Sequence, residues 1–334
     1  MADPLVSVII PTYDSAAYIA GTLESVVSQT FTGHEIILVN DGSRDTPRLE
    51  ASIAPWRTRI HYIHQENRGA AAARNAALRL SRGTWVAFLD ADDVWAPTYL
   101  KEQLAFLSAN PQADLVYADG LLIGDSPTAG RTFMELAPSR GPVTVDSLLA
   151  LRCHVITSAV VARRQTIIDA GLFDETLRRG HDFDLWARLA RRGANLSYQR
   201  KVLISHRIRP DSLTGDEVSD CERAVETLRH VANTLDLTEV ERASAAGSID
   251  RITTRLHVER GKQCLDRGDI SGAIEAIGRA NQVDWRLKQS LILAAIRLWP
   301  SLLLRVRRAS RNVSTSRRRL SSAPRAAAMV LRDH

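Results

Sequence analysis

Hydrophobic and polar positions along the first 120 residues follow two alternating patterns. Short apolar runs rich in β-branched and aromatic residues predict strands at 6–10, 35–39, 60–64, 85–89 and 114–118. Amphipathic stretches between them predict helices at 17–29, 70–81 and 97–109. This alternation predicts an α/β fold, with a mostly parallel Rossmann-like sheet flanked by helices on both faces.

Polar clusters follow three of the predicted strands. Residues 11–14 read PTYD, residues 40–45 read NDGSRD and residues 90–93 read DADD. Ligands of open α/β sheets bind outside the carboxyl ends of the strands. We therefore expect these three clusters to face one crevice.

The remainder of the chain changes character twice. Residues 124–143 are rich in loop-forming residues and 144–215 mix helical and strand patterns, so we assign 1–215 to one domain. Residues 216–296 carry helical periodicity, and 260–282 resemble one tetratricopeptide-type hairpin with a Gly-Asp turn. An α-helical C-terminal extension is the prediction for this part.

The final segment, 297–334, is strongly basic. It contains ten arginines, no lysine and a single aspartate, whereas the preceding part of the chain is mildly acidic. An Arg- and Leu-bearing tail can lie on an anionic membrane surface. A solvated disordered tail is the alternative, and both stay open. Interleaved aromatic residues are lacking, which argues against nucleic acid as a partner.

Bulk features predict a cytoplasmic protein. Among 334 residues, no apolar run approaches the roughly 20 residues of a membrane-spanning helix. The N-terminus lacks the basic start of a signal peptide, and Pro11 stops its apolar run. Cys153, Cys221 and Cys264 are odd in number and widely spaced, so we expect free thiols rather than disulfides or a zinc site.

The cluster at 90–93 places three carboxylates within four positions. Like charges this close resist joint ionisation. A divalent cation would relieve the repulsion of Asp90 and Asp92, and Mg²⁺ or Mn²⁺ is commonly held by one or two carboxylates together with phosphate oxygens. The alternative is an acidic cap for the helix at 97–109, favoured by the helix dipole.

A second alternative for this cluster is a phosphatase. The sequence DADDV fits the DxDx[TV] motif of haloacid-dehalogenase-type phosphatases, in which the first aspartate, here Asp90, is the nucleophile. That motif normally follows the first strand of its domain, whereas here three strand–helix units precede it. The lysine and the later acidic pair of that family also have no convincing counterpart.

Five ordered motifs resemble those of family 2 glycosyltransferases with the GT-A fold. They are VSVIIPTYDSAAYIAGTLESVVSQT, EIILVNDGSRD, NRGAAAARNAAL, WVAFLDADDVW and GLFDETLRRGHDFDLWARLARRG, and they cover about residues 5–215. The resemblance implies a metal-dependent, inverting enzyme that uses a nucleotide-diphosphate sugar as donor. UDP-sugar is the default donor, although dTDP- and GDP-sugars fit the motifs as well.

The resemblance also implies roles in nucleotide binding. Pro11, Thr12 and Tyr13 match the first nucleotide-contact loop, and the tyrosine can stack on a base. Asp41 matches the acceptor of a hydrogen bond from a uracil-type ring N–H, and Arg74 matches an arginine that contacts the nucleotide. The alternatives are a strand-end turn with a packed tyrosine, turn chemistry for Asp41, and a solvated helix arginine.

Around the diphosphate, the family pattern assigns Asp90 to the ribose side and Asp92 to the metal, Mn²⁺ or Mg²⁺, with Asp90 as a second metal ligand. Asp93 supports this site or faces the acceptor. Residues 206–214 resemble a loop that closes over the diphosphate. Arg209 stands where relatives often carry histidine, and it either pairs with phosphate or is an exposed arginine at a strand end.

An inverting transfer also needs a general base. The family places an acidic pair, commonly Glu-Asp, before a helix with a tryptophan; here the sequence is GHDFDLW, with His181 in place of the glutamate. We assign Asp182 as the base that takes the proton of the acceptor hydroxyl. Asp184 is the competing carboxylate and is expected to cap the helix that contains Trp186.

These inferences combine into one functional hypothesis. The protein transfers a sugar from a nucleotide-diphosphate sugar to a hydroxyl of a glycan or lipid-linked acceptor of cell-envelope polysaccharide synthesis. It works in the cytoplasm, and a membrane-binding tail would place it at the inner face of the membrane. Besides the phosphatase, the alternative is a non-catalytic scaffold that binds nucleotide sugars without turnover.

Overall fold

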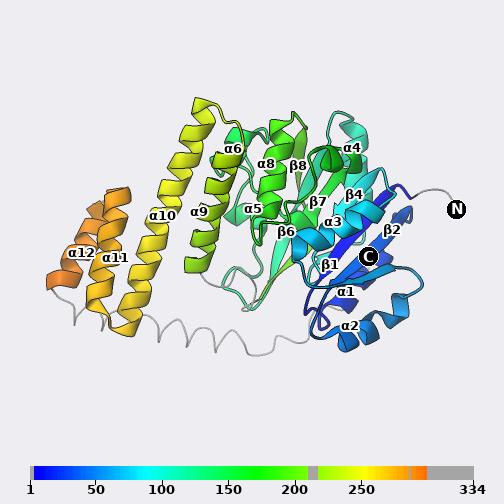
Figure 1. Ribbon diagram of the computed structural model, residues 1–334, viewed down its shortest axis with the longest axis horizontal. Helices are drawn as coiled ribbons and strands as arrows, with labels where there is room; N and C mark the ends of the chain where they lie inside the picture. Colours follow the sequence, from blue (N-terminus) through cyan, green and yellow to red (C-terminus); the bar gives the residue numbers. More distant parts are fainter. Residues whose placement is uncertain (1–3, 210–216, 286, 299–334) are drawn as a thin grey trace, which may run out of the picture. The chain divides into compact units, whose positions relative to one another are not determined.

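A computed structural model describes residues 4–209, 217–285 and 287–298 (Figure 1). The expectations for the end of the 206–214 loop and for nearly all of the basic tail lie outside these residues. The chain divides into two compact units, Met1–Ile249 and Asp250–His334. The predicted boundaries at 215 and 296 remain predictions.

Within the described residues, eight strands form one sheet in the order β3-β2-β1-β4-β7-β6-β8-β5. Their bounds are β1 Val6–Thr12, β2 His34–Asp41, β3 His61–Gln65, β4 Trp85–Phe88, β5 Val94–Trp95, β6 Leu115–Gly124, β7 Val160–Arg163 and β8 Leu196–Ile208. The fold is therefore α/β, as predicted.

The arrangement of β1 explains where the crevice forms. β1 pairs in parallel with β2 on one side and with β4 on the other, so the strand order reverses direction at this point. In open α/β sheets, ligands bind outside the carboxyl ends of the strands at such a reversal. β7 is antiparallel to both β4 and β6, and β8 runs parallel to β6.

The helices connect these strands and continue beyond them. Their bounds are α1 Ile19–Val27, α2 Thr46–Ile53, α3 Ala70–Leu80, α4 Tyr99–Ala109, α5 Phe133–Leu136, α6 Val145–Leu149, α7 Arg164–Asp169, α8 His181–Arg191, α9 Glu217–Thr234, α10 Glu239–Arg267, α11 Ile270–Val283 and α12 Leu287–Leu298. In the part of the chain that the structure describes, none of them combines the length and hydrophobicity needed to cross a membrane.

Helix α3 shows how the sequence sets the packing over the crevice. It contacts β1 and β2, and its buried face consists largely of alanines, among them Ala73 and Ala77. Small side chains let the helix backbone approach the sheet closely. Arg74 therefore emerges from a tightly packed helix.

The predicted elements of the first 120 residues are confirmed within one or two residues at most ends. Strand β2, for example, is predicted at 35–39 and spans His34–Asp41 in the structure. Helix α2 and the two-residue strand β5 were not predicted. β5 exists because its backbone pairs with β8, a partner more than 100 residues away.

The second unit, over its described residues, is helical. Asp269 caps α11 by accepting a hydrogen bond from the backbone N–H of Gly272 (2.8 Å), and Gly268 adopts a left-handed φ of 80°. The Gly-Asp turn between two helices is thus confirmed. A small core of Leu265, Ala273, Ile277 and Ile296 joins α11 and α12 to the end of α10.

Candidate active site

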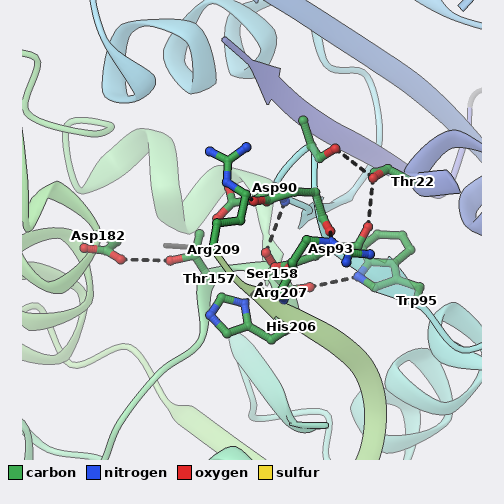
Figure 2. A network of polar contacts seen from close by, with 12 residues as sticks. Thr22, Asp90, Asp93, Trp95, Thr157, Ser158, Asp182, His206, Arg207 and Arg209 are labelled. Carbon is green, nitrogen blue, oxygen red and sulfur yellow. Dashed lines mark hydrogen bonds and ion pairs between the residues drawn. The ribbon is translucent and has the colours of Figure 1, made fainter. Parts of the chain in front are cut away.

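Asp93 anchors the carboxylate cluster rather than facing solvent. Its side chain is fully buried and accepts hydrogen bonds from Nδ1 of His206 (2.9 Å) and from the backbone N–H of Arg207 (2.7 Å) (Figure 2). Burial alone would lower the pKa of His206, but Asp93 and the neighbouring carboxylates raise it to about 9. A charged His206 thus ties β8 to the turn after β4.

Burial and two neighbouring carboxylates oppose the ionisation of Asp92. Its side chain is 19% exposed, and Nε of Arg209 lies 3.3 Å from its Oδ2. Burial, followed by the charges of Asp93 and Asp90, raises the pKa of Asp92 to about 6 despite this arginine. The nearby cations therefore do not fully offset the burial of Asp92 and its repulsion by the two neighbouring carboxylates.

The predicted acidic cap of the helix at 97–109 is wrong. Helix α4 begins at Tyr99, its N-cap residue is Thr98, and no side chain caps it. The carboxylates bond instead to groups from α3 and β8. The turn at 90–93 therefore serves the crevice rather than the helix.

Arg209 and Arg207 share an aromatic partner that the sequence did not reveal. Their guanidinium carbons lie 5.4 and 5.1 Å from the ring centroid of Tyr18, the residue before α1. Arg207 also donates to the backbone carbonyl of Asp92 (3.1 Å). Arg209 is thus a site residue and not a solvated strand-end arginine, and Tyr18 positions it by a cation–π contact.

Arg74 connects the carboxylate cluster to the predicted base region. It is 5% exposed, so the alternative of a solvated arginine is wrong. One Nη donates to Asp90 Oδ1 (2.5 Å) and the other lies 2.7 Å from Nε2 of His181. Phe173 packs beside the guanidinium, 5.6 Å from its carbon to the ring centroid.

The contact with Arg74 determines the tautomer of His181. A guanidinium can only donate, so Nε2 of His181 must accept and the proton resides on Nδ1. Burial and the charge of Arg74 both lower the pKa of this histidine. His181 is therefore a neutral link between Arg74 and its own neighbour in sequence, Asp182.

Asp182 lies in the first turn of α8 and is held on both oxygens. Thr157 Oγ1 donates to Oδ2 (3.0 Å) and the Phe183 backbone N–H donates to Oδ1 (2.8 Å) (Figure 2). Burial opposes ionisation, but His181, Arg74 and these two hydrogen bonds lower the pKa. Asp182 is therefore a fixed carboxylate at neutral pH. Thr157, in the short 3-10 helix Thr157–Ala159 before β7, had no sequence signal.

Asp184 does not cap α8, and that expectation is wrong. The N-cap residue is Gly180, with a left-handed φ of 70° and no side-chain cap, because α8 begins earlier than expected, at His181. Asp184 instead lies buried inside the first turn and accepts a hydrogen bond from Nε of Arg188 (2.8 Å), one turn later. Its carboxylate is thus engaged away from the crevice.

The first predicted nucleotide loop ends β1 as expected. Pro11 and Thr12 are the last residues of the strand, and the Thr12 side chain is buried. Tyr13 is 41% exposed, and the guanidinium carbon of Arg44 lies 5.9 Å from the centroid of its ring. The ring of Tyr13 is therefore accessible to a ligand, and the alternative of a packed tyrosine is wrong.

Asp41 ties the end of β2 to the loop that precedes α3. Its carboxylate accepts from Nε2 of Gln65 (2.7 Å) and from the backbone N–H groups of Arg68 (2.9 Å) and Gly69 (2.8 Å). The turn after β2 is held by Asn40, whose Oδ1 accepts from the N–H of Ser43 (2.9 Å). Turn chemistry thus belongs to Asn40, not to Asp41.

The donor set of this crevice fits a hard divalent cation. Among the described residues, no three His, Cys, Asp or Glu side chains gather into a complete metal site. Asp92 nevertheless offers carboxylate oxygens beside two other carboxylates, and the Asp90 side chain is 36% exposed. Such a partial oxygen set suits Mg²⁺ or Mn²⁺ that shares a phosphate ligand.

Sequence comparison assigns the chain to a family. Residues 7–139 match the model of Glycosyl transferase family 2. The putative teichuronic acid biosynthesis glycosyltransferase TuaG of Bacillus subtilis is 31% identical over 216 residues, which cover 64% of this chain and 83% of TuaG. The chain belongs to glycosyltransferase family 2. An uncharacterized glycosyltransferase of Rickettsia prowazekii is 29% identical over 66% of this chain and 69% of its own length.

Solved structures place this glycosyltransferase in the GT-A fold. The mannosyltransferase PcManGT from Pyrobaculum calidifontis, in complex with GDP-Man and Mn²⁺, matches with a TM-score of 0.61 at 18% identity, over 94% of this chain and 88% of that one. Residues 1–349 of S. aureus TarS, in complex with UDP-GlcNAc, match with a TM-score of 0.56 at 20% identity, over 87% of both chains. The predicted fold is thus confirmed, and family membership argues against the phosphatase alternative.

Proposed function

We propose that this glycosyltransferase transfers a sugar, with inversion, from a nucleotide-diphosphate sugar to a hydroxyl of a glycan or lipid-linked acceptor. The observation that carries the proposal is the chain of contacts from Asp90 through Arg74 to His181, adjacent to Asp182. It links a cation-seeking carboxylate cluster to a fixed, ionised carboxylate across one crevice. Sugar transfer requires the bound donor to lie close to the base that deprotonates the acceptor hydroxyl.

The nucleotide would bind at the carboxyl ends of β1 and β2. The exposed ring of Tyr13 offers a stacking surface at this edge, beside the end of β1. Asp41 would accept a ring N–H of the base through Oδ2, which already accepts from the backbone N–H of Gly69. Uracil, thymine and guanine all carry such an N–H, and the family resemblance makes a UDP-sugar the first choice. Complexes of TarS with UDP and UDP-GlcNAc support this choice, whereas the GDP-Man complex of PcManGT shows that related folds bind guanine nucleotides.

The diphosphate would lie near Asp92 and Arg209. Asp92, with Asp90, would hold Mn²⁺ or Mg²⁺, which when bound neutralises charge on the departing nucleoside diphosphate. Arg209 would exchange its contact with Asp92 for a phosphate oxygen, which its planar fork can bind in a bidentate manner. Tyr18 keeps that guanidinium at the rim of the site.

Asp182 would act as general base. A single displacement at the anomeric carbon requires that the acceptor hydroxyl lose its proton as the new bond forms. The lowered pKa keeps Asp182 ionised, and Thr157 fixes the carboxylate orientation. His181, neutral and bound to Arg74, holds the first turn of α8 beside the donor site.

Calorimetry tests this function directly. The full chain is titrated with UDP, dTDP and GDP, with and without Mn²⁺, alongside Asp92→Asn and Asp182→Asn. We expect metal-dependent binding of one nucleotide that is lost in Asp92→Asn and retained in Asp182→Asn, with transfer abolished in both. Binding without any turnover would favour the scaffold alternative. Absence of nucleotide binding in the presence of metal would refute the proposal.

Place of action is part of the same proposal. The protein would work in the cytoplasm, with the basic segment 297–334 attracted to an anionic membrane that carries a lipid-linked acceptor. Deletion of 297–334 should weaken binding to phosphatidylglycerol liposomes and leave nucleotide affinity intact. Unchanged liposome binding would contradict the membrane role.

A further inference from the structure

Two arginines lie near the start of α8, the helix whose first turn carries Asp182. Arg223 belongs to α9, and its side chain is 14% exposed. Arg179 is exposed and stands two residues before the start of α8. Arg179 lies within the fifth family motif but has no assigned role, and Arg223 lies outside the motifs.

Close packing of α8 and α9 brings these residues together (Figure 1). A Cβ on Gly180, the N-cap residue of α8, would lie 2.1 Å from Oγ1 of Thr227 on α9. Arg223 precedes Thr227 by four residues and therefore lies one turn away on the same face of α9. The face of α9 that touches Gly180 thus carries Arg223 toward the start of α8, where Asp182 lies.

Electrostatics supports the proximity. Burial and the charge of Arg179 lower the pKa of Arg223, whereas the charge of Asp182 raises it. The two guanidinium groups therefore repel each other, and at least one of them attracts the predicted base. Asp220 forms an ion pair with Arg223 but does not abolish this repulsion.

We propose that Arg223 and Arg179 bind a negatively charged group, a phosphate or a carboxylate, carried by the acceptor next to the hydroxyl that Asp182 deprotonates. This inference rests on the proposed function, because Asp182 as base defines where the acceptor hydroxyl lies. An anionic acceptor would otherwise be repelled by Asp182. Paired arginines offset this repulsion and recognise oxyanions through their planar forks.

The rival role for the two arginines is to hold Asp182 ionised, whatever the acceptor. That role predicts equal losses for neutral and anionic acceptors, together with a shift of the acidic limb of the pH–rate profile. The proposed role predicts losses that are confined to anionic acceptors. The two roles are therefore separable by acceptor choice.

The test compares matched small acceptors with the donor that calorimetry selects and with Mn²⁺ present. Glycerol 3-phosphate is compared with glycerol, and methyl glucuronide with methyl glucoside, which separates phosphate from carboxylate recognition. Variants are Arg223→Gln, Arg179→Gln and the charge-conserving Arg223→Lys. Arg229→Gln, which removes an exposed arginine from the same helix, is the control. Release of nucleoside diphosphate to water, without acceptor, reports an intact donor site.

We expect the wild type to prefer one of the anionic acceptors over its neutral partner. Each Gln variant should raise the KM for it by about 10- to 100-fold, the usual range for a lost hydrogen bond to a charged group, and leave donor hydrolysis unchanged. Arg223→Lys should retain part of the preference, and Arg229→Gln all of it. Equal use of neutral and anionic acceptors, or equal losses for both, overturns the inference. Absence of nucleotide binding to the wild type, with metal present, would instead refute the proposed function.

Discussion

Arg74 donates to Nε2 of His181 over 2.7 Å, and this contact fixes a neutral histidine between the donor site and the predicted base. Protonation of His181 would place two cations in contact inside a buried network. His181, which stands where the family commonly has a glutamate, is thus a hydrogen-bond partner of Arg74. The substitution preserves a hydrogen-bond acceptor while removing a negative charge.

The first prediction concerns stability and pH. The pKa of His181 is lowered from 6.5 in the folded protein. Below pH 6.5 the unfolded chain therefore binds more protons than the folded one, and stability falls as the pH drops. His181→Gln retains an acceptor for Arg74 but cannot titrate. We expect the free energy of unfolding, measured by urea denaturation, to fall less between pH 7 and pH 5 in this variant than in the wild type.

His64→Gln serves as the control, since this residue is exposed and lies on the edge strand β3. It should reproduce the pH dependence of the wild type. An identical pH dependence in wild type and His181→Gln would contradict the neutral, buried histidine.

The second prediction concerns repulsion within the carboxylate cluster. Asp92 is forced to ionise beside Asp90 and Asp93, and its pKa is raised to about 6. The charge of Asp92 therefore costs folding free energy above that pH. Asp92→Asn should stabilise the metal-free protein at pH 7 by on the order of 1–3 kcal/mol, measured by urea denaturation. A destabilised variant would show that the ion pair with Arg209 contributes more to stability than burial and carboxylate repulsion cost.

The third prediction separates two roles of Arg209. Its Nε lies 3.3 Å from Oδ2 of Asp92 and therefore competes with a cation for that oxygen. Arg209→Gln should therefore tighten the binding of Mn²⁺ alone by about 3- to 10-fold, as for a partly buried ion pair, and weaken nucleotide binding by a similar factor. Electron paramagnetic resonance of free Mn²⁺ and calorimetry measure the two effects.

Arg200→Gln, at an exposed position of β8, provides a matched loss of charge. It should leave both affinities unchanged. If Arg209→Gln changed the affinities for Mn²⁺ and nucleotide in the same direction, competition for Asp92 would be excluded.

The fourth prediction concerns the N-cap of α8. Gly180 has a φ of 70°, and a Cβ there would meet Thr227 at 2.1 Å. Gly180→Ala should lower stability by about 2–4 kcal/mol through backbone strain and the clash, and should displace Asp182. Gly193→Ala, with a φ of 84° and nothing within 4 Å of its Cβ, is the control.

Since Gly193→Ala carries the strain of a left-handed backbone alone, it should cost about 1 kcal/mol and leave transfer activity intact. Chemical denaturation gives both free energies of unfolding. Equal costs for the two variants would mean that α9 yields to the added methyl group.

Much of the fold could be predicted because local pattern and register specify it. Apolar runs and turn residues located β1, β2, β4, α3 and α4, and the order of motifs identified the family. The strand assignments also placed the three polar clusters at the carboxyl ends of the parallel strands β1, β2 and β4, on one edge of the sheet. Those inferences need only the periodicity of side chains along strands and helices, which the sequence displays directly.

Contacts between distant segments could not be predicted in the same way. Strand β5 depends on pairing with β8, and Tyr18 and Thr157 enter the site only because the sheet order brings loops from β1 and β7 together. The N-cap of α8 was misplaced because Gly180, not a capping side chain, starts that helix. Such features depend on close approach rather than on local preference.

The sequence by itself determined the fold class, the family and the residue types of the site. Only the tertiary structure decided their partners: Asp93 with His206, Arg74 with both Asp90 and His181, and Asp182 with Thr157. The physical reason is that protonation and charge depend on burial and on neighbours within a few ångströms. Those neighbours come from strands and helices that are far apart in the chain.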